Sequence, residues 1–368
     1  MSNSALCINK FLEHHPITAS APCRIDSGGT WDIKALALPL ENIKPLTLNI
    51  ALNLRTSVTL LPYKPGWVKI SSDNFNISEE YQFQEAPFNS QFGIFFAVLS
   101  FFNFHGLEVV IKSTSPVKAG LGGSSTATVA AVKVLTIAGK LLGRKTIDED
   151  DILYISYHME DAINGGMCGF QDQGAAVFGG INKWTWNYSN RETPFFRESI
   201  LDEDKQRELS KHILVAYSGK THISHKTNRV WVEKFLAGQT RSGWIEVNNI
   251  VNRLANNLKI GEWKEASKDL IKEVAIRREI TPEAFTPVID SLIQESENVG
   301  CGARFAGAGG GGSLWALGDI ENINKLRSSW AKILQETQKG KILKCSIDPS
   351  GVKQIGNSSP LSSPRTQR

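Results

Sequence analysis

A glycine-rich turn joins a predicted strand to a predicted helix in segment 115–128, which reads Ser-Pro-Val-Lys-Ala-Gly-Leu-Gly-Gly-Ser-Ser-Thr-Ala-Thr. Residues 107–113 have the β-branched pattern of a strand, and residues 124–142 are rich in helix formers. The first N–H groups of a helix lack intrahelical partners, and glycines let the backbone turn toward an anion. The segment is therefore suited to hold phosphate, and a tight loop without a ligand is the alternative.

Two common phosphate-binding signatures are missing from this turn. It lacks the Gly-x-x-x-x-Gly-Lys-[Ser/Thr] order of a Walker A loop and the Gly-x-Gly-x-x-Gly spacing of a dinucleotide site. Both of these explanations are excluded.

Composition excludes several functional classes. With 368 residues, of which 41% are hydrophobic, the chain can bury a large core, and its length favours two domains. Lys and Arg number 41 against 37 Asp and Glu and are scattered, which disfavours a nucleic-acid partner. The apolar stretch 92–104 is too short to span a membrane, and the five cysteines form no Cys-x-x-Cys pair. We therefore expect a cytoplasmic globular enzyme with reduced thiols.

The predicted elements divide the chain into two α+β domains. Strand and helix patterns alternate through residues 1–205, and residues 206–350 contain amphipathic helices between three strand candidates at 212–217, 313–317 and 341–347. Residues 351–368 are polar and interrupted by proline, which predicts a disordered tail.

Two further motifs flank the central turn. Residues 21–32 read Ala-Pro-Cys-Arg-Ile-Asp-Ser-Gly-Gly-Thr-Trp-Asp, and residues 302–313 read Gly-Ala-Arg-Phe-Ala-Gly-Ala-Gly-Gly-Gly-Gly-Ser. With the central turn, they resemble in order the three motifs of the GHMP kinase superfamily, which includes galactokinase, homoserine kinase, mevalonate kinase and phosphomevalonate kinase. The resemblance spans residues 21–347.

A fourth segment points to the sugar-kinase branch of this superfamily. Residues 165–180 contain Gln-Asp-Gln and look like the corresponding stretch of fucokinases and D-glycero-D-manno-heptose-phosphate kinases. The resemblance implies an N-terminal domain similar to ribosomal protein S5 domain 2 and a ferredoxin-like C-terminal domain. It also implies ATP as the phosphoryl donor, Mg²⁺ as the metal and a sugar or sugar phosphate as the acceptor.

The resemblance assigns the central turn to ATP. The implied nucleotide-binding residues are Lys118, Gly120, Leu121, Gly122, Gly123, Ser124 and Ser125. Ser124 and Glu160 would hold magnesium, a metal that prefers hard oxygen ligands. Ser125 could share the role of Ser124, capping of the helix is an alternative for Ser124, and Asp161 is the rival of Glu160. The four glycines 309–312 are expected to support the turn, with a flexible linker as the alternative.

The same resemblance gives the catalytic residues. Asp172 matches the aspartate that acts as general base toward the acceptor hydroxyl, and a loop aspartate that caps a turn is the alternative. Arg24 matches the basic residue beside that aspartate, where it would hold the carboxylate ionised and offset phosphoryl charge. A surface ion pair is the alternative for Arg24.

The acceptor site is expected in three places. Thr30, Trp31 and Asp32 occupy the position that binds sugar hydroxyls in galactokinase-like members, and a structural turn is the alternative. Gly169 and Gln171 belong to the fourth segment. Gly219 and His222 lie in a loop that resembles Thr-Gly-x-x-Arg, but His222 replaces the arginine, so the substitutes for binding a substrate phosphate are Lys220, His225 and Lys226.

The sequence thus predicts a magnesium- and ATP-dependent sugar kinase, and it is compatible with a homodimer. A kinase for a non-sugar alcohol is one alternative, disfavoured by the Gln-Asp-Gln segment. The other is a GHMP-fold protein that binds a sugar or nucleotide without turnover.

Overall fold

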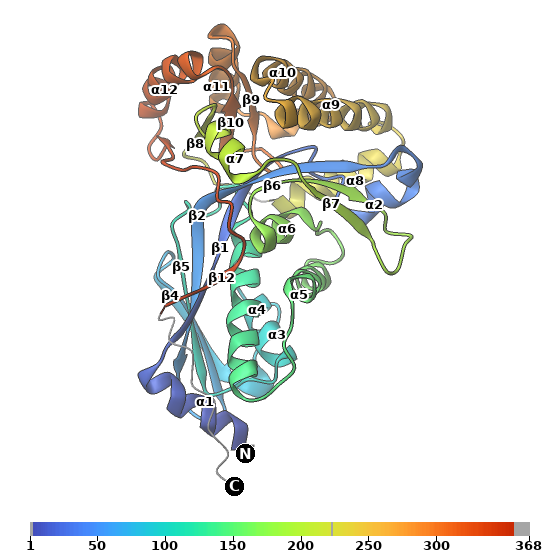
Figure 1. The fold of residues 1–368 in the computed structure, drawn as a ribbon. Helices are drawn as coiled ribbons and strands as arrows, with labels where there is room; N and C mark the ends of the chain where they lie inside the picture. The colour runs from blue at the N-terminus through green and yellow to red at the C-terminus, as the bar shows by residue number, and fades with distance from the viewer. Residues whose placement is uncertain (1–2, 222–223, 357–368) are drawn as a thin grey trace.

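The computed structural model describes residues 3–221 and 224–356, which form two stacked units, each built on its own β-sheet (Figure 1). The chain begins beside the lower unit and returns to it after building the upper one. Both units combine helices with sheet, so the expected α+β class is confirmed.

The N-terminal sheet has eight strands, which run in the order β12-β1-β2-β5-β3-β4, with β6 paired to β2 and β7 paired to β6. Its strands are β1 (Ile17–Ser27), β2 (Leu46–Pro62), β3 (Trp67–Ser72), β4 (Ile77–Gln82), β5 (Leu107–Ser113), β6 (Ile181–Trp186), β7 (Phe195–Ser199) and β12 (Lys353–Ile355). All pairs are antiparallel except β3 with β5. The long β2 pairs with β6 along its first half and with β5 along its second.

Four helices lie on one side of this sheet: three contact its strands, and one packs mainly on the other helices (Figure 1). They are α3 (Gly93–Phe101), α4 (Gly123–Leu141), α5 (Glu149–Ile163) and α6 (Gln171–Phe178). Helix α4 is buried on most sides because it packs against β1 and β2 as well as α5 and α6. Two further helices, α1 (Asn3–His14) and α2 (Lys34–Ala37), and the 3-10 turn Leu38–Ile43 lie at the ends of β1 and β2.

The C-terminal unit has a four-stranded antiparallel sheet in the order β11-β8-β10-β9. Its strands are β8 (Ile213–Tyr217), β9 (Gly302–Phe305), β10 (Ser313–Leu317) and β11 (Lys341–Ile342). Helices α7 (Glu203–Leu209), α8 (Ser224–Leu236), α9 (Arg241–Ile260), α10 (Trp263–Ile280), α11 (Pro287–Asn298) and α12 (Ile320–Gln335) precede or connect them. This strand order is that of a ferredoxin-like sheet, as expected.

Three boundaries differ from the sequence expectations. The predicted domain boundary at 205 and 206 falls inside α7, and the strand expected over 341–347 is only the two-residue β11. The segment expected to begin a tail at residue 351 instead includes β12, which pairs with β1. The rest of the expected tail, 357–368, lies outside the described residues. Within the described part of the chain, no helix is long and apolar enough to cross a membrane.

Candidate active site

The glycine-rich turn has the expected strand, loop and helix order, between β5 and α4. Gly122 is the N-cap of α4 and has φ of 74°, a left-handed conformation that glycine adopts without steric cost. No side chain caps this helix, so Ser124 does not act as a cap. The first N–H groups of α4 thus lack a side-chain acceptor, which leaves them able to bind an anion.

The third motif supports the turn from the C-terminal domain. The N–H of Ser313 donates to the carbonyl oxygen of Ala119 at 2.7 Å, and the N–H of Ser218 donates to the carbonyl of Gly312 at 2.9 Å. Gly312 has φ of 75°, and a Cβ there would lie 2.7 Å from the Ala119 oxygen. The glycine run therefore packs directly against the turn, and the flexible-linker alternative is wrong.

Arg24 connects the turn to Asp172. From β1, its Nε donates to Asp172 Oδ1 at 2.7 Å, and its Nη1 donates to the carbonyl oxygen of Gly120 at 2.6 Å. Although burial lowers the pKa of Arg24, the carboxylates of Asp172 and Asp26 raise it above its usual range, so the guanidinium is charged. Asp172 lies in the first turn of α6, next to Gly122, rather than in a loop.

Glu160, on α5, faces the start of α4. Its Oε2 accepts from Gln173 Nε2 at 2.7 Å, and the hydroxyls of Ser124 and Ser125 lie close enough to its carboxylate to lower its pKa. Burial raises the pKa of Glu160 to about 7, the Ser125 hydrogen bond lowers it, and the Asp172 charge raises it further. This group of one carboxylate and two hydroxyls matches the hard oxygen ligands that magnesium prefers.

Asp161, the rival of Glu160, points elsewhere. Its Oδ1 accepts from the N–H of Cys168 at 3.1 Å, and its Oδ2 lies 3.7 Å from Lys34 Nζ. Adjacent residues on a helix project in directions about 100° apart, so one of the two faces the turn and the other does not. The described residues contain no cluster of three or more His, Cys, Asp or Glu suited to a metal, so further magnesium ligands would come from phosphate oxygens and water.

Asp32 lies in the same cavity as Asp172. Its two oxygens accept from the N–H groups of Thr30, at 3.0 Å, and Gln171, at 3.1 Å. Burial raises the pKa of Asp32 to about 7, and the Asp172 charge acts in the same direction. Thr30 has φ of 91°, which a β-branched residue rarely adopts, so its backbone is held in a strained conformation here. The backbone of Gly169 lies directly against the Asp32 carboxylate.

Two predicted acceptor residues, Trp31 and Gly219, are not brought to this site. The side chain of Trp31 is fully buried, and its ring packs edge-on against Phe235 and Trp244 instead of lining the cavity. Gly219 lies against the backbone of 339–340, away from the cavity. His222 lies outside the described residues, as do the side chains of His225 and Lys226. The expectation that the Trp31 ring covers a sugar is therefore not met.

One cavity of about 770 Å³ unites the remaining residues. The glycine-rich turn forms its middle, including the exposed Lys118, with Glu160, Asp172 and Asp32 toward one end. The other end, beside the β3–β4 turn and α3, is lined by the apolar Phe75, Phe92, Phe95 and Ile111 together with polar residues such as Asn74. Sequence reasoning assigned no role to these residues, nor to Cys168, Asn164 and Asn228 at the carboxylate end.

The sequence also did not predict two residues that contact the side chains of the site. Gln173, which holds Glu160, and Asp26, which lies 3.6 Å from Arg24 Nη1, both occur inside the quoted motifs. The available signal was their position beside the predicted catalytic residues: Gln173 follows Asp172, and Asp26 lies two residues after Arg24.

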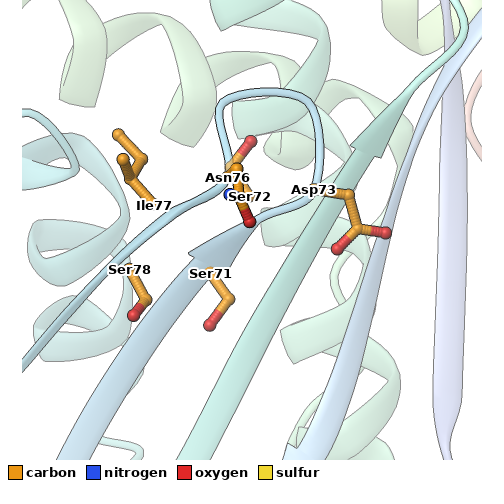
Figure 2. Close-up of a pocket in the computed structure, with 6 residues that line it drawn as sticks. All are labelled: Ser71, Ser72, Asp73, Asn76, Ile77 and Ser78. Carbon is orange, nitrogen blue, oxygen red and sulfur yellow. The ribbon is translucent and has the colours of Figure 1, made fainter.

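A second hollow, of about 220 Å³, lies at the turn between β3 and β4. Figure 2 shows that its side chains spread around the turn rather than converge on one point; they belong to Ser71, Ser72, Asp73, Asn76, Ile77 and Ser78. The arrangement is that of an open turn, so we assign it no function.

Comparisons with known proteins point to the same superfamily. Residues 91–180 match the family model described as the GHMP kinases N terminal domain. A mevalonate kinase of Thermococcus onnurineus (strain NA1) is 23% identical over 300 residues, which cover 73% of this chain and 81% of that protein.

Solved structures show the same fold. Lactococcus lactis galactokinase complexed with galactose superposes with a TM-score of 0.71 at 15% identity, covering 96% of this chain and 100% of that one. A D-glycero-D-manno-heptose 1-phosphate kinase from Bacteriodes thetaiotaomicron gives 0.67 at 15% identity, covering 93% and 100%.

The chain has the two-domain fold of solved GHMP-type kinases, and part of its N-terminal domain matches the model of that family. The matched residues 91–180 include the central turn and the fourth segment, and the expected resemblance to the GHMP kinase superfamily is confirmed. Kinases of this family are phosphotransferases that act on alcohols and use ATP.

Proposed function

We propose that the protein transfers the γ-phosphoryl group of magnesium-bound ATP to a hydroxyl group of a sugar. The observation that carries the proposal is the position of Asp172, whose carboxylate is 24% exposed, fixed by Arg24 and next to Gly122 of the turn. A carboxylate there lies between bound phosphate and the acceptor end of the cavity.

The cavity suits ATP from end to end. The base would occupy the apolar part near Phe75 and Phe92, and the phosphates would lie along the turn to the N-terminus of α4. Magnesium, held by Glu160 and the hydroxyls of Ser124 and Ser125, would neutralise phosphate charge.

The transfer needs little covalent work from the protein. The acceptor oxygen forms a bond to the γ-phosphorus while the bond from that phosphorus to the bridging oxygen breaks, and ADP leaves with the electron pair. Asp172 Oδ2 orients the hydroxyl and takes its proton, because Oδ1 is engaged by Arg24. Arg24 offsets the negative charge that develops on the transferring group.

A neutral sugar fits the acceptor end better than an anion. Asp32 and Asp172 both border this space, and the charge of Asp172, joined above pH 7 by that of Asp32, would repel the carboxylate or phosphate of a charged acceptor. Carboxylates and amides such as Gln171 are well suited to hydrogen-bond sugar hydroxyls. A mevalonate-type acceptor is the second candidate because the curated relative is a mevalonate kinase.

The test is magnesium-dependent ATP consumption with a panel of hexoses, deoxyhexoses, heptoses, their phosphates and mevalonate. We expect a neutral sugar to stimulate turnover, and Asp172→Asn to lower kcat by ~10²–10⁴-fold, the usual contribution of a general base. The variant should bind a non-hydrolysable ATP analogue as the parent does, which controls for folding. Stimulation by mevalonate alone would favour the second candidate, and no stimulation by any acceptor would refute kinase activity.

A further inference from the structure

A row of buried charges runs from the C-terminal domain to the catalytic pair. Cations and carboxylates alternate along it, and neighbouring members lie within 4 Å of each other. In order from α10 to α6 they are Arg277, Glu273, Arg304, Asp26, Arg24 and Asp172. Five of the six side chains are at most 6% exposed, and the sixth, Asp172, opens into the cavity.

Asp26 is the link between the two domains. It belongs to β1, and its Oδ1 accepts from the N–H of Gly307, in the third motif, at 2.6 Å. Its Oδ2 and its own carbonyl oxygen both accept from Arg304 Nη1, at 3.2 and 2.8 Å. Because its carboxylate and carbonyl are both held by the C-terminal domain, Asp26 has little freedom to rotate. Its Oδ1, 3.6 Å from Arg24 Nη1, presents a fixed negative charge to the catalytic arginine.

Arg304 is itself held by a carboxylate on the side away from Asp26. Its Nε lies 3.1 and 2.9 Å from the two oxygens of Glu273, which projects from α10. Arg277, one helical turn further on, lies 3.8 Å from Glu273 and adds a second cation against the same carboxylate. Glu273 is completely buried, so water does not screen these interactions.

We propose that Glu273 and Arg304 are positioning residues, which set the geometry of the Arg24–Asp172 pair through Asp26. Arg24 has a planar guanidinium with donors in fixed directions, so a rotation that moves Nη1 away from Asp26 also moves Nε away from Asp172. The proposal rests on the proposed function for its kinetic consequence, but its geometric claim does not need an acceptor.

Stability alone is a weak explanation for this row. A buried ion pair costs desolvation that its attraction often only offsets, and well-packed apolar residues can replace such pairs without loss. The row also ends at Asp172 rather than within the core. In a site of this kind, a displacement of about 1 Å can lower the rate 10²-fold.

The kinetic test compares two isosteric substitutions four residues apart on α10. Glu273→Gln removes the carboxylate opposite Arg304. Asp269→Asn, the control, removes a buried carboxylate that contacts Arg253, Lys272 and Asn257 and is not a member of the charged row. Both should lower the melting temperature. We expect only Glu273→Gln to slow the single-turnover rate constant of phosphoryl transfer, by ~10-fold or more.

A single-turnover rate constant at saturating enzyme does not depend on the fraction of folded protein, so a purely structural role would leave it unchanged. Arg304→Lys keeps the charge but loses the planar fork, and we expect it to slow transfer as well. Parent-like rate constants in both variants would overturn the proposal. Absence of transfer in the parent would instead count against the proposed function.

The geometric test needs no acceptor. The Nε–H of Arg24 can be assigned in a ¹H–¹⁵N spectrum by its loss in Arg24→Lys, and its hydrogen bond to Asp172 should protect it from exchange with water. We expect faster exchange in Glu273→Gln and parent-like exchange in Asp269→Asn. Unchanged protection in Glu273→Gln would overturn the proposal even if the protein phosphorylated no acceptor.

Discussion

At the level of a single residue, the protonation of Asp32 makes the free energy of unfolding depend on pH. Its pKa is about 7 in the folded protein, raised by burial and by Asp172, but close to 3.8 in an exposed chain. Between these values the folded state holds a proton that the unfolded state has released, so stability is greatest at low pH and falls as pH rises through 7. We predict that Asp32→Asn reduces this fall in the free energy of unfolding between pH 5 and 8 by about 2–4 kcal/mol.

Denaturant unfolding of parent and variant at the two pH values measures this effect. Glu160 titrates in the same direction but is present in both proteins, so its contribution cancels in the difference. The amide of Asn loses one backbone acceptor, which destabilises the variant at every pH and leaves the slope unaffected. Parallel stability profiles for the two proteins would contradict the raised pKa.

Individual residue types were a good guide to chemistry and a poor guide to burial. Arg24 and Asp172 are charged residues in quoted motifs, Glu160 precedes the fourth segment, and the structure brings all three to one cavity. Trp31 was expected beside Asp32, yet adjacent residues after a strand face different surroundings, and its ring is buried against α8 and α9. Which neighbour faces a cavity depends on helices more than 200 residues away in the sequence.

At the level of elements, two adjacent glycines at the junction of the turn with α4 differ in backbone conformation and in the space beside them. Gly122 has φ of 74°, and a Cβ there would lie 3.2 Å from the Asp172 carboxyl carbon. A Cβ on Gly123 would meet only Ser115 Oγ, at 4.0 Å, and its φ is not positive. We predict that Gly122→Ala lowers kcat/KM for ATP by ~10-fold or more, because it strains the backbone and displaces Asp172.

Gly123→Ala is the matched control, since alanine is favoured over glycine within a helix. We expect its kcat/KM to stay within about threefold of the parent and its melting temperature to equal or exceed it. Steady-state kinetics with varied ATP measures both variants. Equal losses in the two would mean that the left-handed conformation at Gly122 is not what the site requires.

Elements with strong patterns were predictable and short edge strands were not. The β-branched residues before the turn and the alanine-rich residues after it indicate β5 and α4 from local preference alone. Strand β12 has three residues, all exposed, in a polar segment, so nothing in its pattern distinguishes it from a tail. It forms because β1 offers an unpaired edge, which is information from the whole fold.

At the level of the whole molecule, the chain returns from the C-terminal domain to close the N-terminal sheet (Figure 1). The α+β class and the ferredoxin-like domain could be inferred from motif order, but this return could not, because its contacts join residues about 300 apart. Arg55 fixes the returning segment: its guanidinium donates to Asp348 Oδ2 at 2.6 Å and to the carbonyl of Gly351 at 2.7 Å. The same side chain binds Ser20 on β1.

We predict that Arg55→Met lowers the free energy of unfolding by about 2–3 kcal/mol, because it leaves the largely buried Asp348 without its cation. Arg278→Met removes an ion pair to Asp290 that is over 40% exposed on both sides, and should cost less than about 1 kcal/mol. Denaturant unfolding measures the two losses. Hydrogen exchange should show the amides of β12 opening faster in Arg55→Met only, because released contacts at Gly351 free the strand from β1. Similar losses in both variants, with β12 equally protected, would mean that strand pairing alone holds the returning chain.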